Sequence, residues 1–159
     1  MNNINLNSKK PVSKRSLSRL MAVQILYQYQ YRDQSEDILN ITNEVIDNYL
    51  LDSEIENISS YREKIDLNLL NDLLAGVLLV LEKIDDKIDK FLDKNHSLEQ
   101  IPDVMLQILR LGAFELQYMK NNPVKVVINE YVNITDAFYD WKKVNFVNAV
   151  LDKIAKAKL

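Results

Sequence analysis

Glycine and proline are almost absent from this chain, which has two glycines and three prolines among its 159 residues. Sheets need tight turns, and tight turns depend on glycine for positive φ and on proline for a fixed φ. Strand-type alternation bounded by glycine turns is hard to find, whereas apolar residues recur at spacings of three and four. The sequence therefore predicts an all-α fold, a compact bundle of six or seven helices.

Apolar periodicity places the helices along the chain. The first is expected from Lys14 to about Gln30, with Ser13 as its N-cap and Pro11 limiting its extension upstream. A longer pattern runs from Leu67 to Phe91, and its first half is apolar nearly all round, which favours a buried bundle helix over a coiled coil. A bend near residues 81–85 would divide it into two helices, and the pattern leaves this open. The other expected helices cover about 38–50, 103–119, 123–138 and 147–154.

The length allows one domain with a proper core, or two small helical subdomains that share an interface. We expect residues 1–12 to form a disordered basic tail and residues 13–159 a single domain. Its N-terminal subdomain would span about 13–94 and its C-terminal subdomain about 97–157. The polar, acidic segment 53–66 is expected to be a loop.

Charge is distributed unevenly along the chain, which has a formal net charge of -3. Six basic residues precede the first acidic residue, Asp33, and residues 142–159 carry a net charge of +4, so the acidic residues concentrate between these ends. If the two ends meet in the fold, they form one cationic surface that could hold a polyanion. If they do not, they are separate solvated ends, and charge alone leaves the two alternatives about even.

Composition excludes several classes of protein. There is no cysteine and one histidine, His96, so thiolate nucleophiles, zinc-thiolate sites and histidine-based triads are not expected. The two glycines, Gly76 and Gly112, lie inside apolar helical patterns and cannot build a phosphate-binding loop. No segment has the length of a signal peptide or of a membrane span. We therefore expect a soluble, cytoplasmic protein with no cofactor, no bound metal and no membrane contact.

Two charged residues, Arg110 and Glu115, interrupt the most apolar expected helix. A buried charge is costly without a partner, so each is expected either to be paired or to face a functional groove. A partnered structural role is favoured for Glu115, and contact with a ligand for Arg110.

Basic and aromatic residues at both ends are candidates for binding nucleic acid. Arg15 and Arg19 stand four residues apart on one helix face whose continuation is apolar, which suits a helix that projects its first turns to a ligand. Phe146 lies close in sequence to Lys142 and Lys143, and an aromatic ring beside a basic surface can stack on unpaired bases. For Arg15 and Arg19 the alternative is a frayed, solvated helix start. For Phe146 the alternative is simple core packing, which is about as expected as base stacking.

Five segments, taken together and in order, resemble the NusB family of bacterial transcription antitermination factors. The likeness extends from about Lys14 to Lys153. The segments are Arg15-x-x-x-Arg19 followed by AVQILY (22–27), DLLAGV (72–77), Leu109-Arg110 with FEL (114–116), PVKVVINE (123–130) and FVNAVLDK (146–153).

The resemblance implies a compact all-helical fold of two packed helical subdomains without catalytic activity. It implies binding to the single-stranded boxA element of ribosomal RNA leaders together with the small-subunit ribosomal protein NusE, in a complex with other Nus factors and RNA polymerase. The RNA-binding positions it implies are Lys14, Arg15, Arg19, Arg110, Phe146 and Asn148. Tyr27 and Glu99 match positions on the surface shared with RNA and NusE, and Lys9 and Lys10 align less securely.

The sequence departs from the family pattern near the last helix. Tyr139 stands where a glycine is usual, Lys143 and Asn145 replace a Ser-x-Lys, and Ala149 replaces another glycine. These departures are expected to shift the RNA contact on that side rather than abolish it.

Two other functions fit the same helices. One is the NusB-like module of ribosomal RNA processing or modification, as in ribosomal RNA methyltransferases, which need a separate catalytic domain that we do not expect in these 159 residues. The other is a structural adaptor whose basic ends bind nothing. Members of the family differ in self-association, so the resemblance leaves both a monomer and a homodimer as alternatives.

Overall fold

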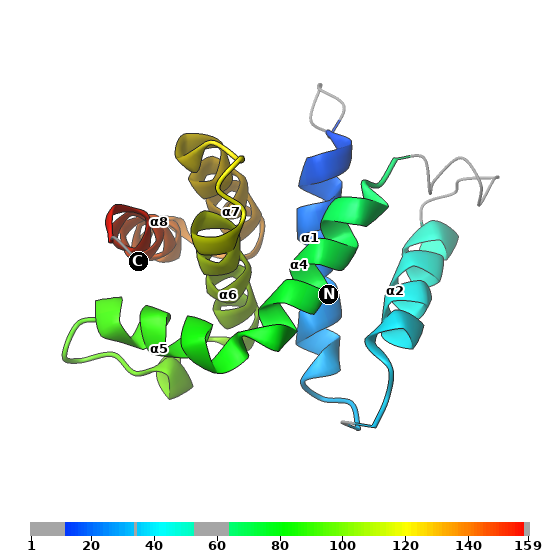
Figure 1. Ribbon diagram of the computed structural model, residues 1–159, viewed down its shortest axis with the longest axis horizontal. Coiled ribbons are helices and arrows are strands. Elements are labelled where there is room, and N and C mark those ends of the chain that lie inside the picture. Colours follow the sequence, from blue (N-terminus) through cyan, green and yellow to red (C-terminus); the bar gives the residue numbers. More distant parts are fainter. Residues whose placement is uncertain (1–11, 34, 53–63, 158–159) are drawn as a thin grey trace.

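The computed structural model describes residues 12–33, 35–52 and 64–157, and Figure 1 shows their arrangement. These residues form seven α-helices, one 3₁₀ helix and no strand, which confirms the all-α prediction. The elements are α1 (Lys14–Tyr29), α2 (Ile38–Asp52), α4 (Leu67–Leu79), α5 (Leu81–Phe91), η1 (Leu98–Gln100), α6 (Asp103–Tyr118), α7 (Val124–Phe138) and α8 (Trp141–Lys156).

Helix α1 begins and ends close to the predicted residues. The Ser13 side chain accepts a hydrogen bond from the Ser16 backbone N–H at 3.0 Å, which satisfies one of the free donors of the first turn. Further along α1, Met21, Ala22 and Ile25 are completely buried. The helix therefore has a polar, basic start and a continuation that belongs to the core.

The long apolar pattern between residues 67 and 91 is divided into two helices at Val80, which settles the question that the sequence left open. Helix α4 buries one face, with Leu69, Leu70, Leu73, Leu74 and Val77, and leaves Leu67 and Leu79 exposed, so it is less enclosed than its nearly all-apolar sequence predicted. Helix α5 buries only Ile84 and Ile88 and exposes its charged face. At Gly76, an added Cβ would lie 2.0 Å from Phe114 Cζ, so this glycine permits close contact between α4 and α6.

Helix α6, the most apolar of the expected helices, is the centre of the bundle. It contacts α1, α4, α5, α7 and α8, and α7 and α8 pack on each other (Figure 1). Helix α7 begins one residue later than predicted, at Val124, and α8 begins at Trp141 with Asp140 as its N-cap. Lys142 and Lys143 therefore lie in the first turn of α8 and not in the preceding connection.

Other predictions from the sequence concern segments that the structure describes only in part. The expected tail 1–12 and loop 53–66 fall mainly outside the described residues, as do Lys9 and Lys10. The division into subdomains near residues 94–97 stays a prediction. No helix in the described ranges is both long and apolar enough to cross a membrane.

Candidate nucleic-acid interface

The start of α1 presents Arg15 at a junction of three elements. Its side chain is 46% exposed, and its Nη2 donates a hydrogen bond to Asn122 Oδ1 at 3.1 Å. Its Nη1 lies 3.5 Å from Oδ2 of Asp66, the N-cap residue of α4. Asn122 belongs to the turn between α6 and α7, so Arg15 lies where α1, α4 and this turn meet.

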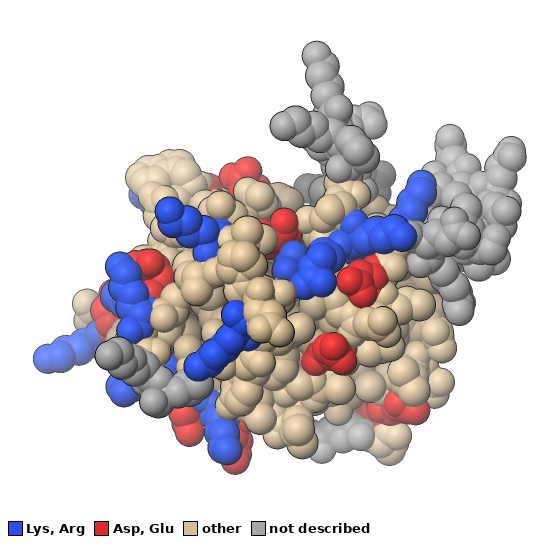
Figure 2. All heavy atoms as spheres, turned by 45° about the horizontal axis from the view of Figure 1, so that its top comes forward, with Lys and Arg blue, Asp and Glu red and all other residues tan. Residues whose placement is uncertain are grey.

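Three exposed lysines lie beside Arg15 or beside its partner Asn122. Lys14 precedes Arg15, and Lys120 and Lys125 flank Asn122 in sequence; none of the three forms an ion pair with another described residue. Figure 2 shows several Lys and Arg side chains on this face of the molecule, with acidic side chains between them. Lys120 and Lys125 were not candidates from the sequence, although both stand close to residue 123, where a helix was expected to begin.

Arg19 lies inside the protein, one turn further along α1. Its side chain is 3% exposed, and its Nη2 and Nε bind the Glu115 carboxylate at 2.6 and 3.0 Å. Its Nη1 lies 3.7 Å from Glu130 Oε2 on α7. The sequence placed Arg19 with Arg15 at a projecting helix tip, and the structure instead turns the Arg19 guanidinium toward α6 and α7.

Glu115 is the acceptor at the centre of this buried network. It is 0% exposed and also accepts hydrogen bonds from Tyr131 Oη at 2.7 Å and Asn122 Nδ2 at 2.8 Å. The structural role that the sequence favoured for Glu115 therefore agrees with the geometry. Because α1, α7 and the α6–α7 turn each supply a donor, the Glu115 carboxylate joins these three elements to its own helix, α6.

The ionisation of this network is set by burial and by the Glu115 charge. Burial opposes the charge of Arg19, but the hydrogen bonds and negative charge of Glu115 outweigh burial and raise its pKa. Burial, followed by the Glu115 charge, raises the pKa of Tyr131 well above its usual value. Tyr131 therefore remains a neutral donor and Arg19 a cation.

Arg110 pairs with α5 instead of standing free in a groove. Its Nε and Nη2 donate to the two carboxylate oxygens of Asp85, each at 2.8 Å, and its side chain is 16% exposed. A role for Arg110 in RNA binding stays a prediction, and RNA would have to compete with Asp85 for the same donors.

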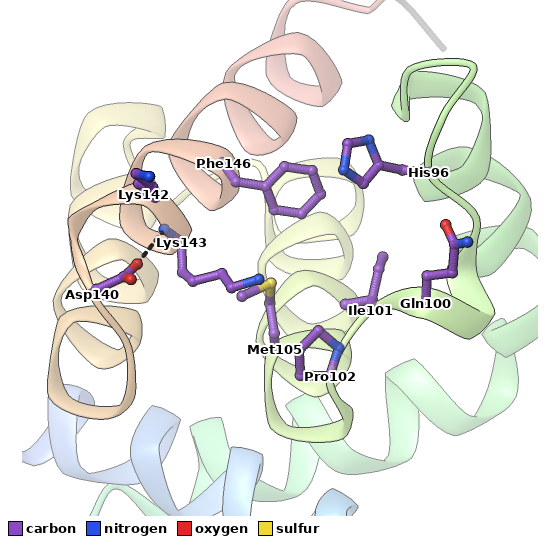
Figure 3. Close-up of a pocket in the computed structure, with 9 residues that line it drawn as sticks. All are labelled: His96, Gln100, Ile101, Pro102, Met105, Asp140, Lys142, Lys143 and Phe146. Atoms are coloured by element: carbon purple, nitrogen blue, oxygen red, sulfur yellow. Dashed lines mark hydrogen bonds between the residues drawn. The ribbon is translucent and has the colours of Figure 1, made fainter.

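A second candidate region lies beside the first turn of α6, around a pocket of about 340 Å³. Figure 3 shows the Phe146 ring pointing toward His96 and the Lys143 side chain extending toward Met105. The rings of Phe146 and His96 are 5.7 Å apart, and Lys142 also lines the pocket. An exposed basic margin beside a half-buried aromatic ring can hold a phosphate and stack a base.

His96 and Asn148 lie at the margins of this region. His96 is exposed, and its Nδ1 lies 2.6 Å from Asp93 Oδ1, a contact that lowers the pKa of Asp93. Asn148 is also exposed, but it follows Phe146 by two residues on α8 and does not line the pocket. Residues two apart on a helix point in different directions, so the structure does not bring Phe146 and Asn148 together.

The two candidate regions lie at opposite ends of α6. Arg15 binds Asn122, which follows the end of α6, whereas Lys142 and Lys143 line a pocket with residues at its start. Helix α6 has 16 residues, so it is about 24 Å long. Lys142 and Lys143 therefore do not merge with Arg15 into one compact cationic surface.

An aromatic cluster lies at the same end of the molecule as the pocket. The Tyr31 hydroxyl donates to Asp103, which raises the pKa of Tyr31 to about 12, and the rings of Tyr27 and Tyr31 are 5.3 Å apart. Burial raises the pKa of Tyr139, and Asp103 and Tyr27 add to the shift. Tyr27 is half-buried here, whereas Glu99 is exposed on η1.

Comparisons with known proteins match this chain over nearly its whole length. The model of the NusB family matches residues 16–156. The transcription antitermination protein NusB of Rickettsia akari is 32% identical over 152 residues, which cover 95% of this chain and 97% of that protein. The NusB protein of Bradyrhizobium diazoefficiens is 34% identical over 157 residues and is covered to 92% of its length.

Solved structures show the same fold. NusB of T. maritima matches with a TM-score of 0.69 and 30% identity, covering 94% of this chain and 93% of that one. A chain from a crystal structure of the antitermination factors NusB and NusE in complex with double-stranded RNA matches with a TM-score of 0.69 and 27% identity, covering 91% of this chain and 98% of that chain. On these matches, which span nearly its whole length, the chain belongs to the NusB family.

Proposed function

We propose that this protein is a transcription antitermination factor that binds boxA-type single-stranded RNA of ribosomal RNA leaders together with NusE, without catalysing a reaction. Family membership supports this function. The solved complex of NusB and NusE with double-stranded RNA, in which one chain has the same fold as this protein, supports RNA binding together with NusE. The observation that carries it in this chain is the exposed Arg15 among lysines without described ion-pair partners.

Phosphate groups would bind at the start of α1 and at the turn between α6 and α7. Arg15 supplies a planar guanidinium, and Lys14, Lys120 and Lys125 supply mobile ammonium groups. Arg19 would act indirectly, because its guanidinium is bound to Glu115 and it holds the helix that carries Arg15.

Bases would bind around the second region, at the start of α8. Phe146 would stack on a base, and Lys142 and Lys143 would hold the adjoining phosphates. Asn148 and Arg110 would contribute from the margins. A single strand that crosses from the start of α1 to this pocket would follow α6 over a distance of about 24 Å.

NusE would bind at the aromatic cluster. Tyr27 and Tyr31 present amphipathic rings of the kind enriched at protein interfaces, and Glu99 adds an exposed charge nearby. The complex would then join other Nus factors and RNA polymerase.

The salt dependence of RNA affinity tests this function. Log affinity for a boxA-type single strand should fall with log salt by about 0.7 for each phosphate contact, so four contacts give a slope of about -2.8. A slope near zero would overturn the proposal. Repeating the measurement with NusE separates the adaptor alternative, in which NusE binds and RNA does not.

A further inference from the structure

We propose that Asn122 is a positioning residue that orients the Arg15 guanidinium for phosphate. Its side-chain amide connects the exposed Arg15 to the buried Glu115. The inference rests on the proposed RNA-binding function, and it assigns a role to a residue that the sequence did not mark as a candidate.

The amide makes two different hydrogen bonds at once. Asn122 Nδ2 donates to Glu115 Oε1 at 2.8 Å, and its Oδ1 accepts from Arg15 Nη2 at 3.1 Å. A primary amide has both a donor and an acceptor, so it can bridge a carboxylate and a guanidinium. An aspartate here would lack the donor and would place a second negative charge against Glu115.

Asn122 itself is held in place by a buried side chain and by a backbone hydrogen bond. Glu115 is 0% exposed and is bound on its other sides by Arg19 and Tyr131. The Asn122 backbone N–H also donates to the Met119 carbonyl at 3.1 Å within the turn. The oxygen that faces Arg15 is therefore fixed relative to the core.

Fixing Arg15 in this way favours RNA binding for two reasons. An exposed arginine loses side-chain entropy when it binds a ligand, and a side chain already held in place loses less. Asn122 is also neutral, so it orients the guanidinium without cancelling its charge. Asp66, at 3.5 Å from Nη1, is the opposite case, because its carboxylate competes with phosphate for Arg15.

Arginine has five N–H donors, and the two contacts engage only Nη2 and Nη1. The remaining donors stay available for a phosphate oxygen. Asn122 belongs to the α6–α7 turn, so its bond to Arg15 also fixes this turn against α1. Lys120 and Lys125 stand on either side of Asn122 in the sequence. The Arg15–Asn122 bond thus sets the spacing between the two parts of the proposed phosphate surface.

A double-mutant cycle tests the inference, with affinity for a boxA-type single strand as the measurement. Arg15→Ala should weaken binding about three- to tenfold, because one charge-assisted contact is lost. Asn122→Ala should weaken binding about threefold when Arg15 is present. In the Arg15→Ala background, Asn122→Ala should have no further effect. Asn121→Ala is the matched control, because Asn121 is the exposed neighbour and its side chain bonds to no other described residue.

Each result distinguishes between the explanations. If Asn122→Ala weakens binding equally with and without Arg15, its effect is structural and the inference is overturned. If Arg15→Ala weakens binding and Asn122→Ala does not, the positioning role is overturned while the proposed function stands. If Arg15→Ala itself has no effect, Arg15 does not contact RNA and both fail at this site.

A second variant decides the question if Asn122→Ala fails to fold. Arg15→Lys keeps the charge at an exposed position but removes the planar fork that binds Asn122. It should bind RNA about threefold more weakly than the wild type, with the same salt slope. If the Arg15→Lys variant binds RNA as tightly as the wild type, RNA binding does not depend on the orientation of the guanidinium, and the inference is overturned.

Discussion

Arg15 and Arg19 lie one turn apart on the same helix face, and their surroundings differ completely. The Arg15 side chain is 46% exposed and binds Asn122 in the α6–α7 turn and Asp66 at the N-cap of α4. The Arg19 side chain is 3% exposed and binds a fully buried carboxylate. The difference arises because α6 ends between them: Arg19 faces Glu115 in its last turn, and Arg15 faces Asn122 in the turn beyond. A paired arginine motif can therefore combine a ligand-facing residue with one that holds the helix in place.

The first prediction concerns the buried side of this comparison and has the largest expected effect. Glu115→Ala should lower the free energy of unfolding by about 3–5 kcal/mol, because it leaves the buried Arg19 without its main partner. Chemical denaturation measures the loss. Glu82→Ala on the exposed face of α5 is the matched control and should change stability by less than about 0.5 kcal/mol.

A double variant then sharpens the interpretation. Arg19→Met with Glu115→Met removes both charges together, so its cost should be smaller than the sum of the two single changes. A loss below about 1 kcal/mol for Glu115→Ala would contradict the buried pair as the link between α1 and α6.

The difference between the two arginines also shows what the sequence could and could not predict. The all-helical fold, the Ser13 cap and the buried centre of α1 follow from local composition and apolar spacing. The burial of Arg19 depends on Glu115, 96 positions away, and no local pattern specifies which face of α1 meets α6. Glu115 was recognised as needing a partner because its charge interrupts an apolar helix, but its partner could not be named.

The candidate site was predictable to a similar extent. Arg15 and Phe146 could be selected from charge and neighbourhood, and the structure leaves both accessible. That they lie at opposite ends of α6 could not be predicted, because the direction in which helices pack is a long-range property. Lys120 was missed because it stands alone in the sequence and gains its place only from the Asn122 contact to Arg15.

The second prediction addresses the exposed side. Replacing Lys120 and Lys125 together by alanine should reduce the salt slope of RNA binding by about 1.4 and the affinity roughly tenfold at physiological salt. Stability should stay unchanged, because both side chains are exposed and form no ion pair with a described residue. Lys83→Ala with Lys94→Ala removes the same charge from α5 and the residues that follow it, and serves as the control. Equal losses in both double variants would mean that net charge, and not this surface, attracts the RNA.

The third prediction returns to the buried network and uses pH. Tyr131→Phe removes one hydrogen bond to Glu115 and should cost about 1 kcal/mol at neutral pH. Because the pKa of Tyr131 is raised in the folded state, its contribution is fully present below the unfolded-state pKa of about 10 and is lost as pH rises toward the folded-state pKa. The stability difference between wild type and Tyr131→Phe should therefore shrink above about pH 10. Thermal unfolding measures this difference. If the stability difference between wild type and Tyr131→Phe stays constant up to about pH 11, Tyr131 ionises as easily in the folded protein as in the unfolded chain, which contradicts the prediction.

The smallest expected effect separates the two partners of Arg15. Asp66→Asn keeps an N-cap oxygen for the Leu69 backbone N–H, since asparagine caps about as well as aspartate, and it removes the charge beside Arg15. With one competitor of phosphate gone, RNA affinity should rise about twofold while stability changes by less than about 0.5 kcal/mol. Fluorescence titration at low salt gives the best resolution, because screening is weakest there. A fall in affinity would mean that the Asp66 carboxylate holds Arg15 in its binding position, in which case the charged and neutral partners of Arg15 would have the same task.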